Sequence, residues 1–158
     1  MGNALHTIRP PAIPENWADF TLPRLLRTFP RILLVDDSKF LADILATFFS
    51  LEGFSARAAY GGQEAMDAVS FEVPDVAFID ISMPDVNGLE VARHIRSTHP
   101  PAIPVLVALT GWDEASDLQA AMDAGFDYFL QKPVDPGSLR VFLGGLVQEM
   151  RHMAPPSD

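Results

Sequence analysis

Cysteine is absent from this 158-residue chain, which excludes a disulfide scaffold, a thiolate nucleophile and a Cys-ligated metal. Positive charge is scarce, because 11 Lys and Arg face 21 Asp and Glu and give a net charge of −10. We therefore expect no direct contact with nucleic acid, whose phosphates require clustered Lys and Arg. No apolar run approaches the ~20 residues of a membrane span, and no secretory signal opens the chain. These absences predict a soluble, cytoplasmic protein.

Proline and charge divide the chain into three parts. Residues 1–30 hold five of the 14 prolines and carry a net charge of +1, and proline at that density blocks a long helix or a central strand. Residues 31–152 carry 8 basic and 18 acidic residues, so the negative charge belongs to this part. We expect 1–30 to be a Pro-rich leader or linker, with helix-like apolar spacing at 22–29. We expect 31–152 to be one folded domain and 153–158 to be a frayed tail.

From residue 31 onward, short apolar runs alternate with helical patterns. The apolar runs predict four strands, at 32–35, 76–79, 105–109 and 128–130, and a loose alternation of larger and smaller residues predicts a fifth at 54–60. The remaining segments predict five helices, at 39–52, 63–71, 88–98, 113–124 and 138–152. Strands that alternate with helices form right-handed crossovers. The pattern therefore predicts an α/β fold with a doubly wound, five-stranded parallel sheet that is covered on both faces.

Polar side chains stand where the predicted strands end. Asp36 and Asp37 follow the first strand, Asp80 the third, Thr110 the fourth and Lys132 the fifth. Parallel strands end at one edge of the sheet, which is where such folds bind ligands. Three carboxylates that meet there repel one another unless a cation is present, and all-oxygen ligation suits Mg²⁺. Because Asp is also a competent nucleophile toward phosphorus, the cluster predicts a magnesium site suited to a phosphoryl group.

Four motifs at these strand ends resemble those of the receiver domain of two-component response regulators. They are Val35–Ser38 (VDDS), Asp80–Gly88 (DISMPDVNG), Ala108–Gly111 (ALTG) and Asp127–Pro133 (DYFLQKP). Each motif alone is a weak signal, but together, in this order, they extend the resemblance over roughly residues 31–150. The resemblance implies a flavodoxin-like (βα)₅ fold with the strand order 2-1-3-4-5.

The resemblance also implies a phosphoacceptor and a metal site. Asp80 would receive a phosphoryl group from a phosphohistidine. Asp36 and Asp37 would hold Mg²⁺ together with Asp80, and Asp37 is the better candidate for direct ligation. The backbone carbonyl of Ser82 would complete the protein ligands of the ion.

A phosphate contact and a switch follow from the same resemblance. Lys132 would contact the phosphoryl group, with a cis peptide bond before Pro133, and Thr110 would move toward the phosphate on activation. The aromatic switch position is Phe129, where the family most often has Tyr, so the contacts of a Tyr hydroxyl are lost. Trp112, two residues after Thr110, is expected to shield the acyl phosphate from water.

The first and last predicted helices carry more apolar residues than one buried stripe needs. In the first helix we expect a core face formed by Leu41, Ile44, Leu45 and Phe48 and widened by Phe40, Phe49 and Leu51. The excess has two interpretations: a deeply buried helix, or a docking surface, because similar receivers present this helix to the kinase or phosphotransfer partner. In the last helix we expect a core face, and a secondary role as the interface of a homodimer, for Leu139, Val141, Phe142, Leu146 and Val147.

The leading interpretation is a phosphorylation-controlled signalling switch whose partner is a histidine kinase or a histidine phosphotransfer protein. Such a receiver is not an enzyme beyond its own phosphorylation and autodephosphorylation. Because the chain ends soon after the last predicted helix, we expect a single-domain regulator or the receiver of a hybrid histidine kinase. The alternative is a Mg²⁺-dependent phosphatase of the haloacid-dehalogenase type, which needs an Asp where this chain has Ser82. A third interpretation is an interaction module that keeps the fold without phosphorylation.

Overall fold

The computed structural model describes residues 5–7, 30–99, 104–111 and 115–152. Within them, five parallel strands lie in the order β3-β2-β4-β5-β6, which is the predicted order 2-1-3-4-5. The strands are β2 (Arg31–Val35), β3 (Ser55–Ala59), β4 (Val76–Asp80), β5 (Val105–Thr110) and β6 (Tyr128–Gln131). The helices are α3 (Lys39–Leu51), α4 (Gly62–Phe71), α5 (Gly88–Thr98), α6 (Ala115–Ala124) and α7 (Pro136–His152). The predicted α/β fold is confirmed.

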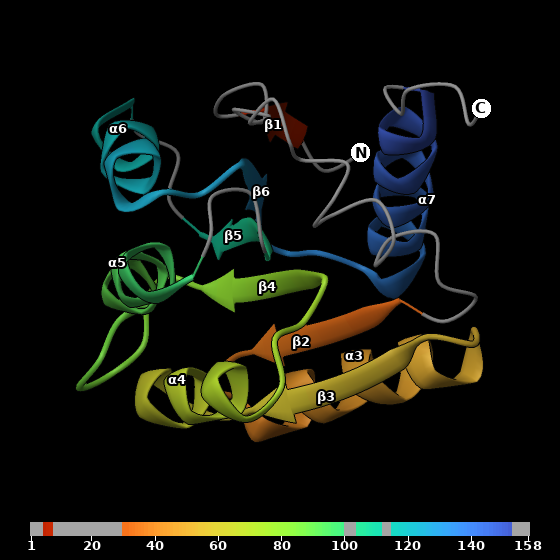
Figure 1. Cartoon of the computed structure of the whole chain (residues 1–158), viewed down its shortest axis with the longest axis horizontal. Helices are drawn as coiled ribbons and strands as arrows, with labels where there is room; N and C mark the ends of the chain where they lie inside the picture. The colour runs from red at the N-terminus through yellow and green to blue at the C-terminus, as the bar shows by residue number, and fades with distance from the viewer. Residues whose placement is uncertain (1–4, 8–29, 100–103, 112–114, 153–158) are drawn as a thin grey trace.

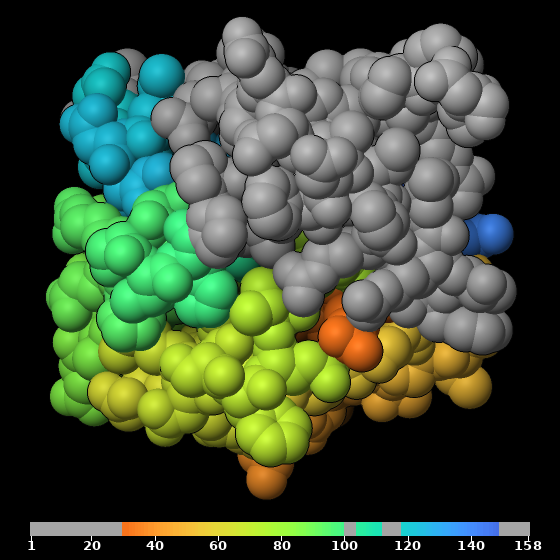
Figure 2. Space-filling model, in the orientation of Figure 1, coloured from red at the N-terminus to blue at the C-terminus, as the bar shows by residue number. Residues whose placement is uncertain are grey.

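Helices cover both faces of the sheet (Figure 1). One hydrophobic cluster joins one face of the strands to α4, α5 and α6, and a second cluster joins the other face to α3 and α7. In the space-filling view α6, α5 and α4 follow one another down one side of the molecule (Figure 2). Successive strand residues point to opposite faces, so Tyr128 belongs to the α3–α7 cluster and Phe129 to the other. No helix among the described residues is long and apolar enough to span a membrane.

A sixth strand, β1 (Leu5–Thr7), extends the sheet beyond β6. It runs antiparallel to β6, with His6 opposite Phe129 in the register. The sequence did not predict this strand, because three residues in a Pro-rich leader show no periodicity. The strand pairs with the edge of β6, which becomes available only when the sheet has folded. The helix-like spacing predicted at 22–29 and the tail predicted at 153–158 lie outside the described residues.

Local signals set the ends of the helices. Ser38 caps α3, since its Oγ accepts a hydrogen bond from the backbone N–H of Leu41 at 3.4 Å. Helix α7 begins at Pro136, two residues before the predicted start at Ser138. The carboxylate of Asp135 accepts hydrogen bonds from the N–H and the Oγ of Ser138, at 2.9 and 2.6 Å, and thereby caps the helix. Proline suits the first helical position because its missing N–H has no partner there.

The predicted core face of α3 was partly correct, since Leu45 is buried and Phe48 packs against the core, but the face is rotated relative to the prediction. The residues of α3 that are buried are Ala42, Leu45 and Phe49. Leu41 and Ile44, which were expected inside, are 44% and 41% exposed. Phe49 was predicted only to widen the stripe, yet its ring stacks on Phe78 of β4 with 6.0 Å between centroids. The small Ala42 lets the helix approach the sheet on this side, so the large apolar residues beside it turn outward.

The predicted core face of α7 was partly correct. Among residues 136–148 of α7, those that are buried are Leu139, Leu143 and Leu146. Val141 was expected inside and is 76% exposed. Phe142 packs edge-on against Phe78 and Tyr128, with ring centroids 6.1 and 5.2 Å apart. The outward turn of Val141 follows from the helical period, because it lies about 200° around the helix from Leu139.

Two buried acidic residues hold the edge of the sheet where the parallel strands begin. Asp75 precedes β4, and its carboxylate accepts a hydrogen bond from the N–H of Arg31 at 2.7 Å. Asp127 precedes β6, and its carboxylate accepts from the N–H of Leu106 at 2.9 Å and from the guanidinium of Arg96 at 2.7 Å. Each carboxylate therefore ties the start of its own strand to a neighbour.

Candidate phosphorylation and metal site

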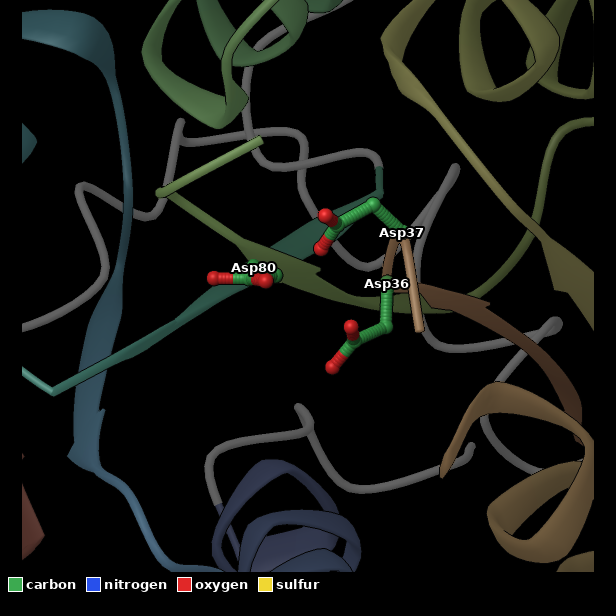
Figure 3. Close-up of side chains that lie close together, drawn as sticks. All are labelled: Asp36, Asp37 and Asp80. Atoms are coloured by element: carbon green, nitrogen blue, oxygen red, sulfur yellow. The ribbon is translucent and has the colours of Figure 1, made fainter. Parts of the chain in front are cut away.

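Three carboxylates meet at the opposite edge, where the parallel strands end. Asp36 and Asp37 follow β2 directly, and Asp80 is the last residue of β4. One carboxylate oxygen of each residue lies within 4.8 Å of the others, and Figure 3 shows the three side chains around a common space. Asp36 and Asp80 are buried, whereas Asp37 is exposed at the mouth of the cluster. The convergence that the sequence predicted for these three residues is confirmed in geometry.

Lys132 lies against the two buried members of the cluster. Its Nζ is 2.9 Å from Oδ2 of Asp36 and 3.2 Å from Oδ2 of Asp80. Burial lowers the pKa of Lys132, but the hydrogen bond to Asp36 and the charges of Asp80 and Asp36 outweigh it, so the pKa is raised. Burial raises the pKa of Asp80; Lys132 opposes the shift and Asp36 adds to it. One ammonium thus pairs with two of the three carboxylates, and the cluster keeps an excess of negative charge.

The backbone orients both buried carboxylates in the same way. Oδ1 of Asp36 accepts a hydrogen bond from the N–H of Ser38 at 2.9 Å, and Oδ1 of Asp80 accepts from the N–H of Ser82 at 3.1 Å. In each case the other oxygen, Oδ2, faces Lys132. Because each N–H lies two residues after its acid, these are short local turns that hold the carboxylates in place. Ser82 is thereby placed next to the cluster, as its predicted part in the metal site requires.

The donor set fits a magnesium ion. Mg²⁺ prefers oxygen ligands and uses one or two carboxylates with waters and substrate oxygens. Among the described residues, three carboxylates lie close together, and the single positive charge of Lys132 compensates their negative charge only in part. A divalent cation would remove the remaining repulsion between the acids.

The other predicted residues lie on the neighbouring strands. Thr110, the last residue of β5, is fully buried, and its carbonyl accepts a hydrogen bond from the N–H of Lys132 at 2.6 Å. The peptide bond between Lys132 and Pro133 is cis, as the resemblance implied. Phe129 is buried in the hydrophobic cluster beneath α4, α5 and α6. Trp112 lies outside the described residues.

Sequence reasoning missed a contact that fixes α3 beside the site. Tyr60, which follows β3, donates its hydroxyl to Oδ1 of Asp43 at 2.5 Å. Nζ of Lys39 lies 5.2 Å from the centroid of the same ring. The hydrogen bond raises the pKa of the Tyr60 hydroxyl, because the neighbouring carboxylate disfavours the phenolate. The partners are 17 residues apart, and no local pattern in the chain predicts such a pair.

An apolar pocket of about 420 Å³ opens beside the carboxylates. Asp36 and Lys132 form its polar end. Its apolar walls come from α3, β5 and the chain that follows β6, namely Leu41, Ile44, Leu45, Leu109, Pro133, Val134 and Pro136. The excess of apolar residues that the sequence shows in the first helix therefore lies partly at this pocket.

The family model described as the response regulator receiver domain matches residues 32–143. The chain belongs to this family. The match covers all five parallel strands and each acid of the cluster. Receiver domains are phosphorylation-controlled signalling switches rather than conventional enzymes, and the haloacid-dehalogenase-type alternative finds no support in these comparisons.

Similar proteins are response regulators of bacteria. The chain is 38% identical over 128 residues to response regulator MprA of Mycobacterium avium, an alignment that covers 81% of this chain and 54% of that protein. It is 42% identical over 103 residues to MprA of Mycolicibacterium vanbaalenii, covering 65% of this chain and 44% of the relative. This receiver therefore spans about half the length of these relatives.

Solved structures of receiver domains share the fold. A Francisella response regulator receiver domain superposes with a TM-score of 0.68 at 25% identity and covers 77% of this chain and 98% of its own. A CheY-like receiver domain protein of Methanospirillum hungatei superposes with a TM-score of 0.70 at 24% identity, covering 80% of this chain and 100% of its own. At 24% identity, the similarity to the Methanospirillum hungatei protein shows a shared fold only.

Proposed function

We propose that this receiver accepts a phosphoryl group on Asp80 from a phosphohistidine of a histidine kinase or phosphotransfer protein. The observation that carries the proposal is the Asp80 carboxylate itself, which is buried at the end of β4 with Lys132 at 3.2 Å and two further acids beside it. In the transfer a carboxylate oxygen of Asp80 forms a bond to phosphorus while the bond between phosphorus and the histidine nitrogen breaks. The histidine leaves with the electron pair, and the receiver holds an acyl phosphate.

The metal part of the proposal assigns Mg²⁺ to Asp36, Asp37, Asp80 and the backbone carbonyl of Ser82. When bound, the ion would neutralise charge on the oxygens of the phosphoryl group. Of Asp36 and Asp37, the exposed Asp37 is the better candidate for direct ligation. The backbone N–H groups of Ser38 and Ser82 keep the two buried carboxylates oriented toward this space.

Lys132 and Thr110 supply the remaining contacts in this proposal. The Lys132 ammonium pairs with Asp36 and Asp80 before transfer and would turn to the phosphoryl oxygens afterwards. The Thr110 hydroxyl would donate a hydrogen bond to a phosphoryl oxygen. Phe129, buried on the neighbouring strand, would respond to that movement by packing alone, since it has no hydroxyl group.

The partner is proposed to dock on the outer face of α3. Phe40 is 72% exposed, and Leu41 and Ile44 are both more than 40% exposed, on the helix that begins beside the acid cluster. Leu41 and Ile44 also line the apolar pocket that ends at Asp36 and Lys132. A partner that buries this patch would bring its histidine to the mouth of the site.

The wider assignments are part of the same proposal. We propose that the receiver acts either as a single-domain regulator or within a hybrid histidine kinase, in the cytoplasm, which is typical of the family. It would catalyse only its own phosphorylation and autodephosphorylation. A homodimer through the last helix remains a prediction, for which the exposed Val141 of α7 is the one apolar side chain we would test first.

One experiment separates this function from its alternatives. The protein is incubated with Mg²⁺ and acetyl phosphate, and the intact mass is measured. A single added phosphoryl group that is missing in Asp80→Asn is the expected result. Rapid multiple turnover of phosphate esters would instead favour a hydrolase, and no adduct under any condition would favour an interaction module that keeps the fold only.

A further inference from the structure

Helix α4 begins with two glycines, although glycine is a poor helix former. Within a helix, glycine is unfavourable relative to alanine. Gly61 is the N-cap, and a Cβ built on it would meet nothing within 4 Å. Gly62 is buried, and a Cβ there would lie 2.6 Å from Cβ of Val86 and also against the carbonyl oxygen of Val86. Gly62 is therefore required, because Val86 comes too close to leave room for a side chain. No such contact requires a glycine at position 61.

Val86 belongs to the loop of residues 81–87, which connects Asp80 to α5. At the far end of this loop Gly88 closes another tight contact, because a Cβ at Gly88 would lie 2.8 Å from Cα of Ile81 and also against the carbonyl oxygen of Asp80. The N–H of Gly88 donates to the carbonyl of Ile81 at 3.0 Å, so the loop folds back on the end of β4. The loop is thus held by close contacts both at its root and at Val86.

The same loop carries a predicted ligand of the metal. Ser82 is tied to the phosphoacceptor through its N–H, 3.1 Å from Oδ1 of Asp80, and the N–H of Met83 donates to the carbonyl of Ile81 at 3.1 Å. A methyl group at Gly62 would have to move Val86 by at least about 0.8 Å to reach the 3.4 Å at which ordinary contact begins, because its carbonyl oxygen is closer still than its Cβ. Metal–ligand distances tolerate only about 0.2 Å. A displacement of this loop therefore exceeds what the site tolerates.

We propose that Gly62 is a positioning residue of the phosphorylation site, which acts through Val86 to hold the loop of residues 81–87, and with it the Ser82 carbonyl, against the Asp36–Asp37–Asp80 cluster. Gly62 contacts no reacting group. The absence of a side chain at Gly62 lets α4 come close to the loop, and the position of the loop determines where the Ser82 carbonyl oxygen lies. The inference rests on the function proposed above.

The test compares Gly62→Ala with Gly61→Ala, its neighbour on the same helix with open space around it. Mg²⁺ is titrated calorimetrically into each metal-free protein without a phosphodonor, and acetyl phosphate labelling is then followed over a range of Mg²⁺ concentrations. We expect Gly62→Ala to weaken Mg²⁺ binding about tenfold or more, as changes to groups that orient metal ligands do. Its labelling rate should approach that of the unchanged protein only at higher Mg²⁺. Gly61→Ala should stay within about twofold in both measurements.

A second variant approaches the contact from the other side. Val86→Gly removes the side chain that rests on Gly62 and adds no atom that could clash, so a loosened loop should again bind Mg²⁺ more weakly. If Gly62→Ala does not fold by circular dichroism, the Val86→Gly titration decides. Unchanged Mg²⁺ affinity in a folded Gly62→Ala, or in Val86→Gly, overturns the inference. If the unchanged protein itself neither binds Mg²⁺ nor gains a phosphoryl group, the proposed function has failed instead.

Discussion

The two edges of the sheet both contain buried aspartates, yet they compensate the charge differently. At the edge where the parallel strands begin, Asp127 pairs with Arg96 at 2.7 Å and also accepts a backbone N–H. At the edge where they end, Asp36 and Asp80 share the single ammonium of Lys132 while Asp37 adds a third carboxylate. Equal burial of the same residue type therefore has two outcomes. A compensated acid stabilises the fold, and an excess of acids forms a site for a cation.

Arg96 makes several contacts at the first edge besides its ion pair with Asp127. Its guanidinium donates to the carbonyls of Gly125 and Pro104, at 2.9 and 2.8 Å, in addition to the carboxylate of Asp127. Gly125 has a φ of 103°, and a Cβ at this position would lie 2.6 Å from Cγ of Arg96. The planar fork of an arginine fits this three-way contact, whereas the single ammonium of Lys132 leaves charge at the other edge uncompensated.

The largest expected effect tests the compensated edge. Arg96→Ala should lower the free energy of unfolding by about 3–5 kcal/mol, because Asp127 is left as a buried charge without its cation. Urea unfolding measures the loss, and Arg93→Ala, an exposed arginine on the same helix, should change it by no more than about 0.5 kcal/mol. The folded Arg96→Ala protein should still take a phosphoryl group on Asp80. Equal costs for the two variants would break the comparison of the edges.

The next effect tests the charge at the other edge. Lys132→Ala should slow labelling by acetyl phosphate on the order of a hundredfold, as the loss of one donor to a developing oxyanion does. Its loss of stability in Mg²⁺ should be smaller than that of Arg96→Ala, because Asp36 and Asp80 keep their hydrogen bonds to Ser38 and Ser82. Labelling rates and urea unfolding are measured in the same buffer. A variant that labels normally but unfolds easily would make Lys132 a structural residue like Arg96.

Mg²⁺ should stabilise the protein through one edge only. At a free concentration 100 times its Kd, an ion that binds only the folded chain raises the free energy of unfolding by about 2.7 kcal/mol. We expect this gain in the unchanged protein and in Asp123→Asn, which alters an exposed acid of α6, but not in Asp37→Asn. Thermal unfolding with and without Mg²⁺ measures it. A gain that survives in Asp37→Asn would place the ion elsewhere.

The smallest effect is a pH dependence in EDTA. Burial raises the pKa of Asp80 above its ordinary value, so the folded chain binds this proton more tightly than the unfolded chain. The contribution of Asp80 to the free energy of unfolding therefore falls as pH rises. The fall begins near the unfolded pKa of about 3.9 and is complete above the higher pKa of the folded chain. Asp80→Asn should therefore match the unchanged protein near pH 3.5 and exceed it at neutral pH. A difference that does not vary with pH would show that folding does not raise the pKa of Asp80.

Local signals were enough to predict the five parallel strands and the five helices. Strands β2, β4, β5 and β6 are short apolar runs that their own residues specify, whereas β3 shows only a loose alternation of residues. Ser38 and Asn87 cap their helices through contacts three residues away. The site residues follow strand ends, and parallel strands necessarily end at one edge, so their meeting follows once the topology is known. Asp36, Asp37, Asp80 and Lys132 were predictable for this reason.

Long-range packing decided what the sequence could not. The rotation of α3 depends on how Ala42 and Phe49 pack against the sheet. The amphipathic pattern of the helix is equally compatible with a buried face that contains Leu41 and Ile44. The strand β1 needed the open edge of β6 as a template. These choices depend on shape complementarity between distant segments, which no single segment encodes.

The sequence by itself determined the class of fold, the carboxylates, the lysine and their common edge, because these follow from periodicity, from strand ends and from topology. Only the tertiary structure decided which acids are compensated and which of two adjacent glycines is required. Arg96 and Asp127 are 31 residues apart in the sequence. Gly62, the first residue of α4, closely approaches Val86, which lies in the loop just before α5. Such pairs form only when the chain has folded, since charge compensation and close approach are properties of distance in space rather than of distance along the chain.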